Sequence, residues 1–417
     1  MRRQIEGSQA VAQAVVLCRP EVMACYPISP QTHIVETLSR KVKAGEVGTC
    51  QFLNVESEFG ALGVLIGASA MGARTYTATT SQGLLFMAEA VYNAAGLGLP
   101  IVMTIANRAV GAPINIWNDH SDSMAMRDAG WIQLYAENNQ EAVDLHIQAF
   151  KLAEEMSCPV MVCMDGYILT HAVEVVDLPT QDQVDAFLPP YDPVQVLDPK
   201  DPVTIGAMVG PEAFAEVRYL SHQNHLRALD LVPRLLDSFQ QIFGRASGGL
   251  LESYQIEGAE TIILALGSVN GTIKDAVDVL RKEGWPVGSV KLGLYRPFPT
   301  HALRHVVNEA KRVIVIEKDL AVGMGGIVSS DVKMALRGLP TLVETVIGGL
   351  GGRPIPRASI IDVVKQACLE GLEEPHFLDL HWDVVNRELT RQLDQRRSGP
   401  VSVNLLRNVN PFGVNPV

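Results

Sequence analysis

The sequence predicts an α/β protein in which a larger parallel-sheet domain is followed by a smaller one. Short apolar runs alternate with helix-length stretches along almost the whole chain, which is the pattern of repeated strand and helix units. Several of these runs, such as LPIVMTIA, PVMVCMDG and TIILALGS, are nearly continuous apolar segments, as strands covered on both faces must be. The length of 417 residues allows two or three domains, and 47% apolar with only 6% aromatic residues fits an α/β composition.

Changes in composition divide the chain into four segments. Residues 1–173 are predicted to form the first α/β domain. Residues 174–258 are predicted to be a linker or arm followed by a helical connection, because residues 174–202 hold six prolines and many aspartates. Residues 259–373 repeat the alternation of strand and helix and predict the second, smaller domain, and residues 374–417 predict a helix with a Pro/Asn-rich tail.

Charge and cysteine spacing exclude several classes of function. The net charge is −12 and no Lys/Arg cluster stands out, which argues against nucleic-acid binding. No run is long enough to span a membrane. None of the six cysteines falls in a CxxC pair, so we expect buried thiols in a reducing cytoplasm and neither zinc nor an iron–sulfur cluster in this chain. The six are Cys18, Cys25, Cys50, Cys158, Cys163 and Cys368.

The first element, MRRQIEGSQAVAQAVVLC, is predicted to be an amphipathic helix and not a signal peptide, because polar residues interrupt its apolar run. A short strand over residues 21–26 follows and stops at YPISP, where two prolines fix a stiff turn. A rigid loop at the carboxyl end of a strand can hold the hydroxyl of Ser29 against a ligand. A plain turn into the helix THIVETLSRKVKAG is an equally good interpretation of the same spacing.

The stretch from Asn54 to Gly83 is the one around which the predicted site is built. Glu58 opens an apolar helix rich in Gly, Ala and Ser, which implies close packing against the sheet or a second chain. The strand RTYTATT follows and ends at Thr80, so two strand ends face one crevice, where open α/β sheets bind ligands. On residue type alone, Glu58 is more simply explained as a first-turn acid favoured by the helix dipole.

The next helix, LLFMAEAVYNAAG, leads to a buried strand that ends abruptly at Asn107-Arg108. The planar guanidinium of Arg108 suits a carboxylate or phosphate, although a structural ion pair is an alternative. Residues 111–131 then form a polar and aromatic loop without clear periodicity, in which His120 is more simply a hydrogen-bonded loop histidine than a proton carrier. A helix, NQEAVDLHIQAFKLAEEM, and the strand PVMVCMDG complete the first domain.

The second series begins with TIILALGS and continues through KLGLYRPFP, RVIVIEKD and TLVETVIGGLGG, with helices between these runs. Its turn GMGG does not predict a dinucleotide site, because the spaced glycines and the acidic residue some twenty positions later are not both present.

Taken in order, YPISPQT, VESEFGA, TATTSQGLLFM, ANRA, INIWNDHSDSMAMRDAGW and LGLYRPFP resemble the alpha subunit of the 2-oxoacid:ferredoxin oxidoreductases, and that of pyruvate:ferredoxin oxidoreductase most of all. The likeness runs from the first helix to about Ala367. It implies a thiamine pyrimidine-binding domain over residues 1–173 and a transketolase C-terminal-like domain over residues 259–373. It also implies that thiamine diphosphate is shared with a partner chain.

The resemblance assigns roles to residues that match the family motifs. Glu58 matches the glutamate that bonds N1′ of the aminopyrimidine, where a carboxylate favours the imino tautomer whose N4′ takes the proton from thiazolium C2. Arg108 matches the arginine that binds the substrate carboxylate. The implied cofactor-binding residues are Glu58, Pro27, Ile28, Thr80 and Gln82, and the implied substrate-binding residues are Ser29, Asn107 and Arg108.

The implied reaction is oxidative decarboxylation of a 2-oxo acid with coenzyme A, giving acyl-CoA and CO2. Pyruvate is the family's usual substrate. Ser29 stands where the pyruvate enzymes have threonine in YPITP, and the room left by the missing methyl group would suit a branched or aryl acid such as phenylglyoxylate. A harmless exchange of small residues is the alternative.

The resemblance also implies partner chains. A beta subunit would bind the diphosphate through Mg²⁺, since this sequence lacks the GDG motif, and 4Fe–4S clusters would lie in partners that include a gamma and a ferredoxin-like subunit. Electrons would pass to ferredoxin, or to NAD through an extra subunit. We expect a cytoplasmic hetero-oligomer, a dimer of heteromers. The alternatives are a non-catalytic scaffold subunit of such a complex and a split thiamine dehydrogenase or transketolase.

Overall fold

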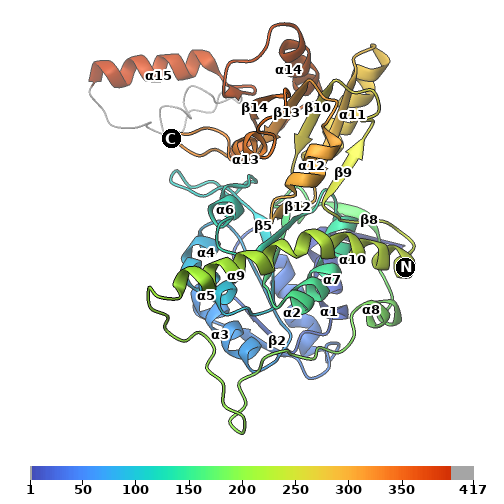
Figure 1. The fold of residues 1–417 in the computed structure, drawn as a ribbon, viewed down its shortest axis with the longest axis vertical. Coiled ribbons are helices and arrows are strands. Elements are labelled where there is room, and N and C mark those ends of the chain that lie inside the picture. Colours follow the sequence, from blue (N-terminus) through green and yellow to red (C-terminus); the bar gives the residue numbers. More distant parts are fainter. Residues whose placement is uncertain (1, 396–417) are drawn as a thin grey trace, which may run out of the picture.

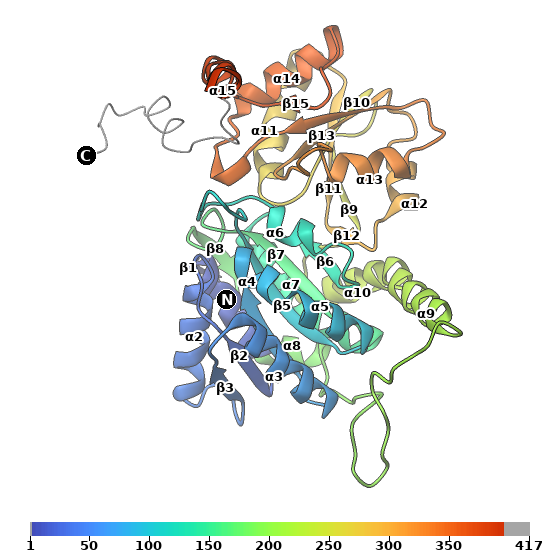
Figure 2. The ribbon, with the colours of Figure 1, turned by 90° about the vertical axis from the view of Figure 1, so that its left-hand side faces the viewer.

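The computed structural model describes residues 2–395 and consists of two α/β domains, one stacked on the end of the other (Figures 1 and 2). The predicted tail beyond residue 395 lies outside the described residues. The first sheet has seven strands, parallel except for β12 at one edge. Their order is β12 (Leu294–Arg296), β6 (Ile132–Tyr135), β7 (Val160–Asp165), β5 (Ile101–Asn107), β4 (Thr75–Thr79), β2 (Val22–Cys25) and β3 (Gln51–Asn54).

Helices cover both faces of this sheet, which explains its continuous apolar strands. All seven residues of β5 are buried, because alternate side chains enter two different cores. One core includes α1 (Gly7–Leu17), α2 (Thr32–Lys43) and α7 (Asn139–Met156), and the other includes α3 (Glu58–Ala70) and α5 (Ala88–Gly96). Short helices α4 (Ser81–Phe86) and α6 (Ser121–Ala125) lie near the carboxyl ends of the strands.

Several local predictions for the first domain were wrong. Residues predicted as the start of an amphipathic helix form strand β1 (Arg2–Glu6), and α1 is buried at nine of its eleven positions because it lies between α2 and α7. The single helix predicted over residues 84–96 is broken at Met87 into α4 and α5. Strand β6 was missed, because only four apolar-rich residues separate an aperiodic loop from a helix.

The segment predicted as a linker or arm, residues 174–258, is partly packed structure. Strand β8 (Val173–Asp177) pairs with β1, and α8 (Gln181–Phe187) packs against α10 (Ala228–Phe243) through the Phe187 and Phe239 rings, 5.4 Å apart. Helix α9 (Phe214–Leu226) was not predicted and has no buried residue. Extended chain without regular elements joins α8 to α9 (Figure 2).

The second sheet has six strands, and β9 alone among them runs antiparallel. Their order is β15 (His376–Phe377), β14 (Leu342–Ile347), β13 (Arg312–Glu317), β10 (Thr261–Ala265), β11 (Val287–Leu292) and β9 (Leu251–Tyr254). Helices α11 (Val269–Lys282) and α14 (Arg357–Leu369) cover one face, and α12 (Thr300–Val306) and α13 (Val328–Ala335) the other. A 3-10 turn η1 (Leu350–Gly352) and the predicted C-terminal helix, α15 (Trp382–Gln395), complete the described chain.

The segment LGLYRPFP corrects the predicted separation of the domains. Its strand β12 leaves the second domain and pairs antiparallel with β6 of the first sheet. The core beside α3 and α5 continues into the second domain through Tyr295, so the two domains share apolar packing. In the part of the chain that the structure describes, no helix combines the length and apolarity that a membrane span requires.

Candidate active site

Glu58 lies at the first position of α3, with its side chain turned inward. Ser57 caps the helix by accepting a hydrogen bond from the Gly60 amide at 3.1 Å, and Glu58 is 7% exposed. Its carboxylate lies against the turn that follows β4. A Cβ atom placed on Gly83 would be 2.6 Å from Glu58 Oε1 and 2.7 Å from Thr79 Oγ1, so glycine is needed for this close approach.

Within residues 2–395, the Glu58 carboxylate has no hydrogen-bond or ion-pair partner. A mostly buried carboxylate without protein partners can be hydrated only through the small area that it exposes, and Glu58 is 7% exposed. The first-turn position agrees with the helix-dipole interpretation, but the dipole does not explain why the side chain points into the sheet edge. An acid held in this way has its acceptor oxygens available for a ligand.

The turn at Thr80-Ser81-Gln82 is held by its own side chains. Thr80 Oγ1 donates to the Ala106 carbonyl at 2.5 Å, and Ser81 Oγ donates to the Ala109 carbonyl at 2.6 Å. Thr80 is fully buried and its side chain supports the turn, whereas the resemblance assigned it to cofactor binding. Gln82 is partly exposed and remains at the crevice.

The loop YPISP after β2 approaches Arg108, which brings together two of the residues that the resemblance assigned to substrate binding. Arg108 Nη1 donates to the Ser29 carbonyl at 2.8 Å, and Nε donates to the Asn115 carbonyl at 3.2 Å. Pro27 and Ser29 are exposed, Ile28 is half-buried and Arg108 is 6% exposed. The alternative of a structural ion pair for Arg108 is wrong, since none of the described acidic groups pairs with it.

Two nearby residues that the sequence did not single out fix this geometry. Gln31 Nε2 donates to the carbonyls of Tyr26 and Ala78, at 2.8 and 3.1 Å, and so joins the YPISP loop to β4. Asp122 accepts from the side chain of Asn107 at 2.8 Å. Asn107 is fully buried and its amide nitrogen donates to Asp122, while its amide oxygen has no hydrogen-bond partner among the described residues, so its predicted contact with substrate stays a prediction.

His120 confirms the simpler interpretation, a hydrogen-bonded loop histidine. Its Nε2 lies 2.7 Å from Asp165 Oδ1, and both side chains are 1% exposed. The other Asp165 oxygen pairs with Lys318 Nζ of the second domain at 2.7 Å. This cluster joins the domains and does not face the crevice beside Glu58.

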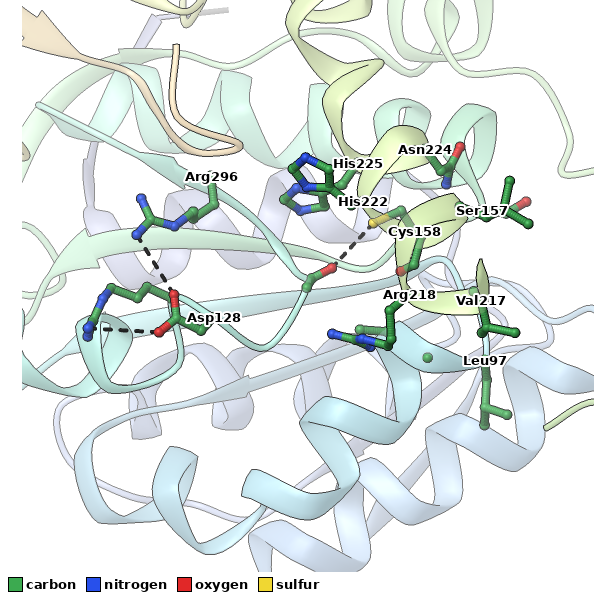
Figure 3. A pocket seen from close by; sticks show the side chains of 17 residues that line it. Leu97, Asp128, Ser157, Cys158, Val217, Arg218, His222, Asn224, His225 and Arg296 are labelled. Atoms are coloured by element: carbon green, nitrogen blue, oxygen red, sulfur yellow. Dashed lines mark hydrogen bonds and ion pairs between the residues drawn. The ribbon is translucent and has the colours of Figure 1, made fainter. Parts of the chain in front are cut away.

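The cavity drawn in Figure 3 contains none of the predicted site residues. It measures about 440 Å³ and lies under α9, at the amino ends of the strands, where Arg218 and Arg296 line it. Asp128 lies 4.0 Å from Arg296, and Asn224 donates to the Met156 carbonyl at the end of α7. Its cations therefore face acidic groups and helix carboxyl ends. Within residues 2–395, no group of three His, Cys, Asp or Glu side chains is arranged to hold a metal ion.

Comparisons with known proteins agree with this arrangement. Residues 13–233, more than half of the chain, match the family model described as pyruvate flavodoxin/ferredoxin oxidoreductase, thiamine diP-bdg. Residues 259–360 match the model described as pyruvate:ferredoxin oxidoreductase core domain II.

Named relatives cover almost the same length. The pyruvate synthase subunit PorA of Methanosarcina barkeri is 48% identical over 386 residues, which cover 90% of this chain and 96% of that protein. The ketoisovalerate oxidoreductase subunit VorA of Pyrococcus horikoshii is 40% identical over 356 residues, which cover 85% and 90%.

A solved 2-oxoglutarate:ferredoxin oxidoreductase from Magnetococcus marinus, with 2-oxoglutarate, coenzyme A and succinyl-CoA bound, has the same fold. Its TM-score is 0.67 at 19% identity, and the match covers 88% of this chain and 65% of that chain. This likeness confirms the predicted α/β fold class. The chain therefore belongs to the pyruvate flavodoxin/ferredoxin oxidoreductase family, which confirms its predicted place among the 2-oxoacid:ferredoxin oxidoreductase alpha subunits.

Proposed function

We propose that this chain is the alpha subunit of a thiamine diphosphate-dependent 2-oxoacid oxidoreductase, with pyruvate as its substrate. The complex would convert the 2-oxo acid and coenzyme A to acyl-CoA and CO2, while two electrons leave singly to iron–sulfur clusters in partner chains. The observation that carries the proposal is the buried, unpartnered carboxylate of Glu58 beside Gly83. The 48% identity to a pyruvate synthase subunit supports the choice of pyruvate.

The residues present fit the aminopyrimidine end of thiamine diphosphate. Glu58 would accept a hydrogen bond from N1′ and hold the proton there. The ring would thus supply the hydrogen-bond partner that none of the described residues gives to this carboxylate. Pro27 and Ile28 are on the YPISP loop and Gln82 is in the turn after β4, and these residues would border the ring. When bound, the cofactor supplies the electron sink that decarboxylation of a 2-oxo acid requires.

Arg108 and Ser29 would hold the substrate carboxylate. Two backbone carbonyls accept hydrogen bonds from Arg108 Nη1 and Nε, so among the described contacts one N–H group on Nη1 and two on Nη2 remain for the acid. The Ser29 hydroxyl lies on the loop to which Arg108 is bonded. These donors would orient the carboxylate, and a hold that is not too strong favours its departure as CO2.

The crevice is rimmed by exposed apolar side chains, which supports a subunit that works only with partners. Phe59 and Phe86, whose rings are 6.4 Å apart, are 41% and 60% exposed beside the helix that carries Glu58. Ile114 and Trp117, on the loop after Arg108, are 76% and 53% exposed. Exposed apolar groups gathered around a site indicate a covering chain. The relatives are themselves named as subunits.

The covering chain would be the beta subunit, which holds the diphosphate and Mg²⁺. A gamma subunit and a ferredoxin-like subunit with 4Fe–4S clusters would complete a cytoplasmic dimer of heteromers. The six free cysteines of this chain support a reducing compartment.

The test is Glu58→Gln in the assembled complex, with reduction of a low-potential acceptor by pyruvate and coenzyme A as the measurement. Loss of the acid should lower kcat by about 10²- to 10⁴-fold, the usual share of a general acid–base group. The matched control is Glu56→Gln, an exposed acid two residues earlier, which should leave kcat unchanged. Near-normal turnover of the Glu58 variant would leave the scaffold hypothesis standing instead.

A further inference from the structure

Asp122 is a buried carboxylate that joins two strand ends of the proposed site. Its Oδ2 accepts hydrogen bonds from the backbone amides of Ser81 at 2.9 Å and Arg108 at 3.0 Å. Its Oδ1 accepts from the side-chain amide of Asn107 and the backbone amide of Ser123, both at 2.8 Å. The residue is fully buried, so protein groups supply all of these partners.

The two backbone amides that donate to Oδ2 belong to the two parts of the proposed site, the turn beside the cofactor-binding acid and the substrate-binding arginine. Ser81 opens the turn that brings Gly83 against the Glu58 carboxylate, and Arg108 is the cation proposed to hold the substrate. Ser81 has a φ of +49°, a conformation that side-chain-bearing residues rarely adopt, so its backbone must be held by its surroundings. One oxygen atom of Asp122 therefore fixes the relative position of the turn beside Glu58 and the backbone of Arg108.

Only an ionised carboxylate satisfies this arrangement. Both oxygens face two N–H donors, so an asparagine in any orientation would place its own NH2 group against two other donors. Burial is the largest influence and raises the pKa of Asp122 above its ordinary value, while the hydrogen bonds from Ser81, Asn107, Arg108 and Ser123 offset part of that rise by favouring the charged form. A buried charge is a poor way to stabilise a loop, because well-packed apolar groups do so without the desolvation penalty.

We propose that Asp122 is a positioning residue of the active site. It holds the Ser81 turn, which lies beside Glu58, and the backbone of Arg108 in one fixed geometry. The acid proposed to bind the cofactor and the cation proposed to bind the substrate can then act together. This inference rests on the proposed function and adds to it a residue that touches neither ligand.

The test is Asp122→Asn in the assembled complex. Displacement of Arg108 should raise the apparent KM for the 2-oxo acid by about 10- to 100-fold, because errors of about 1 Å in placing a reacting group have effects of this size. Hydrogen–deuterium exchange should be faster in peptides covering residues 80–84 and 106–110. The matched control is Asp144→Asn, which removes an equally buried acid of α7 that pairs with Arg245. It should lower stability without changing KM or exchange at the two strand ends.

A second variant keeps the inference testable if Asp122→Asn does not assemble. Asn107→Ala removes one of the four donors and leaves the three backbone amides, so KM should rise by about 3- to 10-fold, with faster exchange over residues 106–110. If Asn107 acts through Asp122, the effects of the two substitutions will be less than additive in the double variant.

Unchanged KM and unchanged exchange in either variant would overturn the positioning role, and so would equal effects of Asp122→Asn and Asp144→Asn. Exchange is measured without turnover. An inactive wild-type complex, or an active Glu58→Gln complex, would therefore contradict the proposed function while leaving the tie between the strand ends to be judged from exchange alone.

Discussion

The two sheets differ in what lies at the carboxyl ends of their strands. In the second sheet, the Asp165 carboxylate of the first domain lies between the ends of β10 and β13. In the first sheet, Glu58 has no partner within residues 2–395. Asp165 accepts from the Ser268 amide at 3.1 Å, at the start of α11, and pairs with Lys318 at 2.7 Å. Strand order reverses between β10 and β13, which is where open α/β sheets usually bind ligands. The second domain thus receives its neighbour's carboxylate at its switch point, whereas we propose that the first domain receives a ligand beside Glu58.

The difference lies in how many partners each carboxylate has. Burial alone would raise the pKa of Asp165, but Lys318 and then His120 hold it well below the ordinary value, so the group stays charged. A Cβ atom on Gly267 would lie 3.1 Å from both Asp165 Oδ1 and His120 Nε2, so this pair packs closely against the turn after β10. Asp165, which has charged partners, stabilises the contact between the domains, whereas we propose that Glu58, which has no partner among the described residues, binds a ligand.

The largest effect should follow from breaking the filled crevice. Asp165→Asn leaves Lys318 buried without a counter-ion, which should lower the free energy of unfolding by about 3–5 kcal/mol. Denaturant unfolding of the full chain measures this. Asp128→Asn, at a residue whose side chain is 67% exposed, is the control and should change stability by less than about 0.5 kcal/mol. A similar small change for Asp165→Asn would mean that the cluster does not hold the domains together.

The difference in unfolding free energy between wild type and Asp165→Asn depends on pH with a defined sign. Because the folded-state pKa of Asp165 is depressed, its contribution is fully present above the unfolded value, 3.8, and is lost as the pH falls through the folded pKa. The stability difference between wild type and Asp165→Asn should therefore be constant from about pH 5 to 8 and shrink only below about pH 4. A difference that disappears near neutral pH would contradict this assignment.

A smaller effect is expected from altering the open crevice without removing its charge. Arg108→Lys keeps the cation but loses the planar group that bonds the Ser29 and Asn115 carbonyls together. The apparent KM for the 2-oxo acid should rise by about 10- to 100-fold, corresponding to roughly 1.4–2.7 kcal/mol. Arg127→Lys, at the opposite edge of the sheet, is the matched control and should not change KM. Equal KM values for both variants would remove Arg108 from substrate binding.

The smallest effect concerns the shape of the open crevice. Ser29→Thr adds one methyl group to the loop that Arg108 holds, and a methyl group in a binding pocket changes substrate preference by about 10-fold or somewhat more. The ratio of kcat/KM for pyruvate to that for 2-oxoisovalerate or phenylglyoxylate should rise accordingly. Ser221→Thr on the exposed helix α9 provides the control. An unchanged ratio would favour the harmless exchange considered for Ser29.

Sequence patterns identified the residues whose position depends on segments that are close to them in the sequence. The apolar run of β5 predicted that Arg108 would stand at a strand end, and the glycine-rich turn predicted that Gly83 and Glu58 would face one crevice. The same reasoning did not show that the side chains of Asn107 and Thr80 bond to neighbouring protein groups, because a polar residue at a strand end can point either to the crevice or into the loop beneath it. Asp122 was visible only as one of several polar residues in an aperiodic loop.

Local sequence by itself determined the two series of strands and helices, the family motifs and the acid at the start of α3, because hydrophobic periodicity and motif order act over a few residues. Tertiary structure alone decided that β12 completes the first sheet, that Asp165 meets Lys318 across 153 positions, and that Glu58 has no partner in the part of the chain that the structure describes. These outcomes depend on contacts between distant segments, and no local pattern of apolar and polar residues encodes which distant groups will meet.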